Sequence, residues 1–219
     1  FGEDILDLAY YWHKTVLFKG NELQISRTGW SGEFGYELYL EDHEQGDNLF
    51  DALLAAGKPY GVAPGAVNQT RRIESGILSW GVDMGIDENP YQVGLGRLVE
   101  LENDHHFIGR AALEKIKDQC VEKTLVGLLI DGSPIEANES PWNLYYNRKN
   151  VGKLTSLSYS PRLEKNIALG LVSRDFSEVG TELSVTTWDG ERRIYVSELP
   201  FLPKLQNGDA RSLLQLSKK

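Results

Sequence analysis

The chain has 219 residues, a formal net charge of −9 and 41% hydrophobic residues, so it is an acidic protein that can bury a sizeable core. The acidic balance argues against nucleic acid or an anionic membrane as a main partner, because both require a basic surface. The single cysteine, Cys120, excludes an intramolecular disulfide and favours a reducing compartment, so we expect a cytoplasmic protein. No apolar run approaches membrane-spanning length.

The first 119 residues predict a mixed sheet with packed helices. Apolar alternation indicates strands, repeats at helical spacing indicate helices, and the turn signal at 19–22 indicates a hairpin. The expected elements are a short helix or turn at 2–8, strands at 10–18, 23–28, 36–40 and 77–80, and helices at 44–56, 66–75 and 109–119. Alternation also returns over 94–101.

After residue 119 the pattern becomes almost entirely that of strands. Six short candidates are expected, at 123–131, 143–147, 151–158, 166–173, 182–188 and 191–199. Tight turns at 148–150 and 188–191 favour hairpins, and this spacing predicts a small barrel or sandwich. We therefore expect an α+β fold class with a first region at 1–119, a β domain at 120–205 and a tail at 206–219.

A glycine-rich stretch between two predicted strands is the strongest candidate for a binding site. Ser26–Gly35 contains glycines at 29, 32 and 35, with Trp30 among them, and Glu37 follows in the next strand. Alternation places Tyr36, Leu38 and Leu40 on one strand face and Glu37 on the other. A strand carboxylate can accept two parallel N–H bonds from the amino-pyrimidinone edge of a pterin or guanine, although a solvated strand face also explains it. Trp30 could stack on such a planar ligand or cap the core.

Other polar clusters have weaker interpretations. Arg71 and Arg72 are adjacent in a predicted helix, so only one can face inward; one could pair with Glu74 or Glu37, and the other could meet an anionic ligand. His105–His106 lacks the spacing of a metal site and is interpreted as a surface loop, so we expect no metal. The residues assign no catalytic group.

Several motifs together resemble the glycine cleavage T-protein family of folate-dependent aminomethyltransferases and their relatives. The matching stretches are Ser26-Arg27-Thr28-Gly29, Gly35-Tyr36-Glu37, Arg72-Ile73-Glu74-Ser75-Gly76, Gly81-x-Asp83-Met84, Pro90-x-x-x-Gly94-Leu95, Phe107-Ile108-Gly109-Arg110-x-Ala112-Leu113 and Thr155-Ser156-x-x-x-Ser160-Pro161-x-Leu163. Trp30, the Val67-Asn68-Gln69 turn and Arg97 depart from the aminomethyltransferases, and the combination is closer to dimethylsulfoniopropionate demethylases.

The resemblance implies a tetrahydrofolate-dependent transferase that moves an S-methyl group from a small-molecule sulfonium donor. It implies that Glu37, Trp30, Tyr36, Asn68 and Arg72 bind the cofactor, with Asn68 standing where the family has a pterin-binding arginine. The alternatives are an aminomethyltransferase of glycine cleavage, another folate-dependent demethylase, or a non-catalytic folate-binding module. An upstream flavin-binding segment would favour the last of these.

The resemblance also predicts that this chain is incomplete. Family members are longer and begin with a segment that supplies much of the folate site, and this chain opens on Phe1 rather than Met. We therefore expect the 219 residues alone to be inactive and to bind folate weakly, if at all. The oligomeric state is not predicted.

Overall fold

The structure is a computed structural model that describes residues 1–66, 69–203 and 211. The chain divides into two compact units, one formed by residues 1–68 with 204–219 and one by residues 69–203. The predicted boundary at 119/120 stays a prediction, and most of the predicted tail at 206–219 lies outside the described residues.

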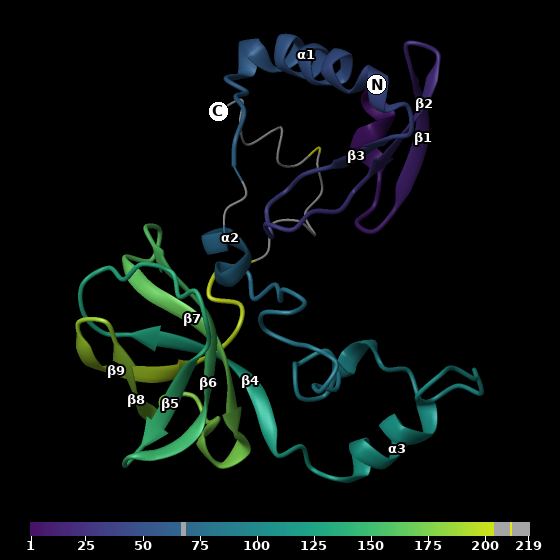
Figure 1. Cartoon of the computed structure of the whole chain (residues 1–219). Coiled ribbons are helices and arrows are strands. Elements are labelled where there is room, and N and C mark those ends of the chain that lie inside the picture. The colour runs from purple at the N-terminus through teal and green to yellow at the C-terminus, as the bar shows by residue number, and fades with distance from the viewer. Residues whose placement is uncertain (67–68, 204–210, 212–219) are drawn as a thin grey trace. The chain divides into compact units, whose positions relative to one another are not determined.

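Residues 1–66 of the first unit contain a three-stranded antiparallel sheet in the order β1-β2-β3, accompanied by the helix α1 (Figure 1). Its elements are η1 (Glu3–Asp7), β1 (His13–Phe18), β2 (Asn21–Ser26), β3 (Glu37–Leu40), η2 (His43–Gln45), α1 (Gly46–Gly57) and η3 (Lys58–Tyr60). The predicted hairpin is confirmed: Lys19 and Gly20 connect β1 to β2, and both have positive φ, as a tight turn that matches the strand twist requires.

One face of this sheet forms the core of the unit. Leu23 and Ile25 of β2 are fully buried against Ile5 and against Leu49 of α1. Alternate residues of the neighbouring strands, Val16, Phe18, Tyr36, Leu38 and Leu40, pack on the same cluster. The opposite face of the sheet is therefore free to carry polar side chains.

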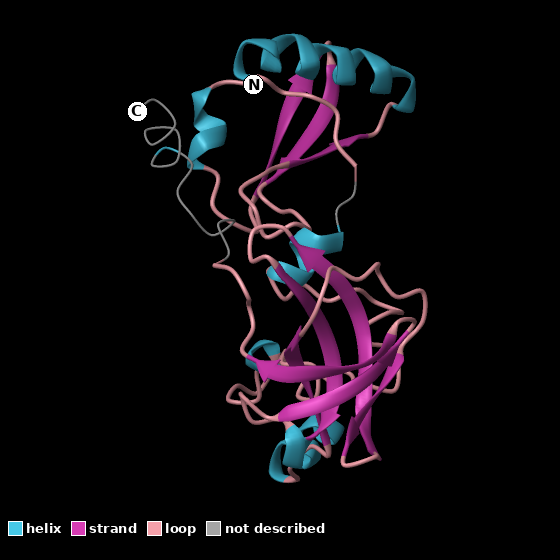
Figure 2. Cartoon of the chain, turned by 90° about the vertical axis from the view of Figure 1, so that its left-hand side faces the viewer, coloured by secondary structure: helices cyan, strands magenta, loops and turns pink. Residues whose placement is uncertain are grey.

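The second unit is built on a closed six-stranded antiparallel barrel in the order β4-β7-β6-β5-β8-β9 (Figure 2). Its elements are α2 (Gln69–Glu74), η4 (Gly96–Leu98), α3 (Arg110–Asp118), β4 (Lys123–Ile130), β5 (Trp142–Tyr146), β6 (Lys149–Ser160), β7 (Lys165–Ser173), η5 (Arg174–Phe176), β8 (Glu182–Thr187) and β9 (Gly190–Ser197). All six predicted strands are confirmed, and of the two expected arrangements, barrel or sandwich, the structure has the barrel. The β5–β6 turn falls at Asn147–Arg148, one residue earlier than expected, and both residues have positive φ.

Inward-pointing aliphatic side chains fill the barrel. Leu128, Leu144, Leu154, Val172, Val185 and Ile194 are among its fully buried members. A second cluster joins Ile73 of α2 to Ile167 and Leu169 of β7, so α2 packs against the barrel wall.

The predicted strand at 77–80 is wrong, and the alternating stretch at 94–101 does not form a strand either. At 77–80 only Trp80 forms an isolated bridge, with Met84, because the Asp83 carboxylate accepts the Ser79 N–H that a strand ladder would use. At 94–101 the backbone bonds locally instead: Leu95 N–H donates to Pro90, and the η4 turn follows.

Candidate functional site

The glycine-rich stretch forms the loop that connects β2 to β3, between Ser26 and Glu37. Gly32 in its middle has φ +74°, a conformation that residues with a Cβ seldom adopt. Trp30 precedes it and keeps 38% of its surface exposed, so its indole is accessible at the loop. The sequence thus predicts the position of this loop correctly.

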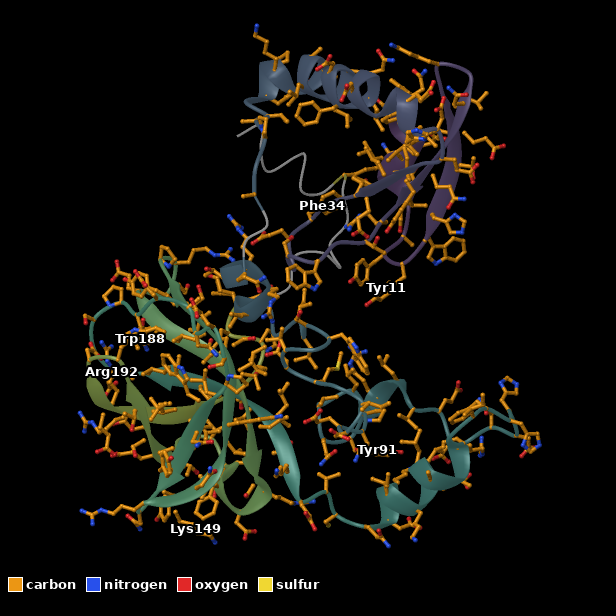
Figure 3. All side chains as sticks on the ribbon, viewed as in Figure 1. Tyr11, Phe34, Tyr91, Lys149, Trp188 and Arg192 are labelled. Carbon is orange, nitrogen blue, oxygen red and sulfur yellow. The ribbon has the colours of Figure 1, made fainter. Side chains whose placement is uncertain are left out.

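Arg27 anchors the base of the loop and was not among the predicted site residues. It is 2% exposed, and its guanidinium lies 3.7 Å from the centroid of the Phe34 ring, a cation–π distance. Its backbone carbonyl accepts the Tyr11 N–H at 3.1 Å, so Tyr11 and Phe34 flank Arg27 (both are labelled in Figure 3). The sequence could have predicted that Arg27 is buried, because it continues the alternation of Leu23 and Ile25 on one face of the strand.

Glu37 lies on the sheet face opposite the core, as alternation predicts. It is half-buried and stands directly across from Ser26 of β2. The Thr28 hydroxyl donates a hydrogen bond to Glu37 Oε2, and the Tyr39 hydroxyl donates to the same oxygen at 3.2 Å. Among the described residues, no hydrogen bond reaches Glu37 Oε1, so this oxygen keeps its full acceptor capacity.

Tyr10 is a second residue of this region that the sequence did not single out. Burial is the largest cause that raises the pKa of Tyr10 to about 12, and the neighbouring Tyr11 is the second. The charge of Glu37 raises this pKa further, whereas the charge of Arg27 lowers it. The Tyr10 ring centroid lies 4.0 Å from that of Tyr11. Tyr10 is therefore a neutral phenol at physiological pH.

Tyr36 is turned away from Glu37. Its ring packs on the core cluster, and its hydroxyl donates to the Ile5 carbonyl at 3.1 Å. Burial raises the pKa of Tyr36, while Arg27 acts against that increase. The structure does not bring Tyr36 to the face that carries Glu37, and its predicted role in binding stays a prediction.

Arg72 lies in the other unit, in a buried polar network. It is 3% exposed and donates to Asp83 Oδ2 and to Ser156 Oγ, at 2.7 Å in each case. The hydroxyls of Thr155 and Ser156 each donate to Asp83 Oδ1 at 2.6 Å. These contacts connect α2 to β6 and give Arg72 a structural role, and its predicted contact with the cofactor stays a prediction.

Glu74 forms a second buried polar contact between the same two elements. It is 1% exposed and accepts hydrogen bonds from Ser160 Oγ at 2.6 Å and from Arg162 Nε at 3.0 Å. Asn68, the remaining predicted site residue, lies outside the described residues.

Three of the cavities formed by described residues lie in the unit of residues 69–203, and Glu37 lines none of these three. One of about 610 Å³ lies beside Tyr145 and Ser184, where the β5–β8 pairing ends. One of about 430 Å³ is polar and includes the Glu88–Lys153 ion pair. One of about 470 Å³ lies beside Phe107 and Ile108.

Within residues 1–66 and 69–203, no three His, Cys, Asp or Glu side chains are grouped closely enough to hold a metal ion. None of the helices in residues 1–66 and 69–203 has both the length and the apolar character needed to cross a membrane.

Comparison with known proteins identifies two family models that match successive parts of the chain. The GCVT N-terminal domain matches residues 3–103, and the glycine cleavage T-protein C-terminal barrel domain matches residues 123–202. The second match covers the six strands of the barrel described above.

Curated relatives match most of this chain but only about half of their own length. A dimethylsulfoniopropionate demethylase of Ruegeria pomeroyi is 37% identical over 90% of this chain and 54% of its own length. An aminomethyltransferase of Desulfitobacterium hafniense is 38% identical over 83% of this chain and 49% of its own.

One solved structure shows the same fold. The glycine cleavage system aminomethyltransferase T of Bartonella henselae superposes with a TM-score of 0.77 at 22% identity, over 90% of this chain and 54% of its own. The chain therefore spans about half the length of the relatives that it matches.

Proposed function

We propose that this chain, which belongs to the glycine cleavage T-protein family, forms part of a tetrahydrofolate-dependent one-carbon transferase. The observation that supports the proposal most is the Glu37 carboxylate. It is half-buried at the end of the loop that carries the partly exposed Trp30, and its Oε1 accepts no hydrogen bond from the described residues. The remaining walls of the site would come from the part of the family's domain that these 219 residues do not contain.

The chemistry of Glu37 fits a pterin edge. The 2-amino-4-oxo ring presents two parallel N–H donors, and a carboxylate presents two acceptor oxygens in the matching geometry. Trp30 offers an aromatic face to a flat ring at the same loop. When bound, tetrahydrofolate supplies N5 as the acceptor of the one-carbon group. The residues of this chain bind and orient the ring, which lowers the barrier by alignment rather than by acid–base chemistry.

For the donor we propose dimethylsulfoniopropionate, with transfer of one S-methyl group. As the new N5–C bond forms, the C–S bond breaks with its electron pair left on sulfur, and N5 releases its proton to water. The leaving group is a neutral thioether and requires no strong acid. The presence of Trp30 and Asn68 supports this choice. The aminomethyltransferase alternative is supported equally by overall identity, at 38% against 37%.

The donor can be tested in a restored protein, which we define as this chain joined to the upstream half of the Ruegeria pomeroyi demethylase. We expect formation of 5-methyltetrahydrofolate that depends on dimethylsulfoniopropionate, measured by chromatography of the folate products. Glycine-cleavage activity without any turnover of the sulfonium would assign the chain to the aminomethyltransferases instead.

Folate binding is tested by Glu37→Gln in the restored protein. The substitution keeps the size of the side chain but replaces a charged acceptor, so we expect the binding free energy for tetrahydrofolate to weaken by roughly 1–3 kcal/mol. Calorimetric titration measures it.

Glu22→Gln is the matched control for this experiment. It makes the same charge change at an exposed residue of β2, on the same sheet face as Glu37. An affinity unchanged by Glu37→Gln would remove Glu37 from the site.

A further inference from the structure

The side chains around Glu37 form a directed chain of hydrogen bonds. Thr28 Oγ1 lies 2.9 Å from Ser26 Oγ and also donates to Glu37 Oε2. A hydroxyl carries one proton, so Thr28, having donated it to the carboxylate, must accept from Ser26. The direction of donation is therefore Ser26 to Thr28 to Glu37.

The register of the sheet explains why these groups meet. Ser26 and Glu37 are cross-strand partners, and Gln24 faces Tyr39 one step further along the same face. Thr28 follows Ser26 by two residues, just past the end of β2. Tyr39 follows Glu37 by two residues, so its hydroxyl can reach back to Glu37 Oε2 at 3.2 Å.

The hydrogen bonds from Thr28 and Tyr39 both end on Glu37 Oε2, and this affects the other carboxylate oxygen, Oε1. The terminal torsion of a glutamate side chain is broad and nearly free in solution. Two donors on Oε2 restrict that torsion, while Oε1 keeps its capacity to accept hydrogen bonds. A carboxylate held in this way before the ligand arrives loses less conformational freedom on binding.

We propose that Thr28 is the positioning residue for Glu37, with Tyr39 as a weaker second donor. This inference rests on the proposed folate function and adds the reason why the carboxylate is presented to the pterin edge in one orientation. Thr28 does not touch the ligand in this arrangement. It acts through Glu37 alone, so its effect should appear only with ligands that Glu37 recognises.

The test compares two ligands in the restored protein: tetrahydrofolate and its 2-desamino analogue, which lacks one N–H donor of the edge. For Thr28→Val, which removes the hydroxyl and keeps the shape, we expect Kd for tetrahydrofolate to rise roughly tenfold. Kd for the analogue should rise by a clearly smaller factor, because one of the two donors that Glu37 meets is already missing there. Thr28→Ser retains the donor and should restore the affinity for tetrahydrofolate.

A double variant and a control separate positioning from general damage. In the Glu37→Gln background, Thr28→Val should cost less than about twofold further, because the carboxylate that Thr28 orients is gone. Thr15→Val is the matched control, since Thr15 is an exposed threonine on the same sheet face and makes no side-chain hydrogen bond among the described residues. Tyr39→Phe is a second test of the positioning role. It removes a hydroxyl from an exposed residue, so this variant should fold even if Thr28→Val does not. We expect it to weaken tetrahydrofolate binding by a few-fold.

The outcomes that overturn the inference differ from those that overturn the proposed function. Equal losses for both ligands, additive losses with Glu37→Gln, or unchanged affinity in Thr28→Val and Tyr39→Phe would each refute the role of Thr28. A restored wild-type protein that binds no tetrahydrofolate would refute the proposed function, and the inference with it. Loss in Glu37→Gln without loss in Thr28→Val would leave the function standing and reject only the positioning role.

Discussion

Replacing Asp83 by alanine is expected to lower the free energy of unfolding by about 3–5 kcal/mol, the range for breaking a buried ion pair from one side. Asp83 and Arg72 are 1% and 3% exposed, and their atoms are 2.7 Å apart. Alanine would leave the guanidinium buried without its counter-charge. It would also leave the Ser79 N–H and two barrel hydroxyls without the acceptor they now share. Urea denaturation followed by far-ultraviolet circular dichroism measures the loss.

The matched control is Asp131→Ala, which removes the carboxylate of an exposed Asp–Arg pair. Asp131 and Arg193 are 3.4 Å apart, with side chains 49% and 65% exposed. Solvent screens that pair, so its removal should cost at most about 1 kcal/mol. If the two alanine variants lose the same stability, the Asp83 network is not the element that holds α2 to the barrel.

The Arg72 network shows where sequence reasoning stops. The predicted helix containing Arg72 is confirmed, with bounds at Gln69–Glu74 instead of 66–75. However, its partner Asp83 lies in a loop, and Ser156 lies 84 residues away in sequence. Nothing in the spacing of the sequence indicates which of several polar groups will meet a buried guanidinium. The sequence alone is equally compatible with an Arg72 that binds a ligand and an Arg72 that stabilises the fold.

Features that depend on local periodicity were predicted much better. The barrel strands follow from alternation and turn residues, and each lies within two residues of its predicted bounds. The same alternation placed Glu37 opposite the core face correctly. Alternation could not predict the hydrogen bond from Thr28 to Glu37, because that bond depends on how the loop after Ser26 folds back. The failed strand at 77–80 has a similar cause, since one side chain, Asp83, took the backbone donor.

Gly152→Ala is expected to destabilise the chain by about 3 kcal/mol or more, at the upper end of the usual cost of overpacking. A Cβ at Gly152 would lie 2.3 Å from the carbonyl oxygen of Leu171 and 2.8 Å from the Cα of Val172. Both are backbone atoms of β7, which pairs with β6 along its length. No side-chain rotation can relieve the clash, so the strands must separate. The same denaturation experiment measures the effect.

The direction in which Gly152→Ala changes the stability distinguishes a close strand contact from open space. Glycine inside a strand is normally less stable than alanine by roughly 0.5–1 kcal/mol, because it loses more backbone freedom on folding. Gly152→Ala would therefore stabilise the barrel if the space were open. Gly85→Ala provides the control, since its Cβ would meet only Glu88 Oε2, at an ordinary contact distance of 3.5 Å. It should change stability by less than about 0.5 kcal/mol. A Gly152→Ala variant as stable as the parent would mean that β6 and β7 do not approach each other this closely in solution.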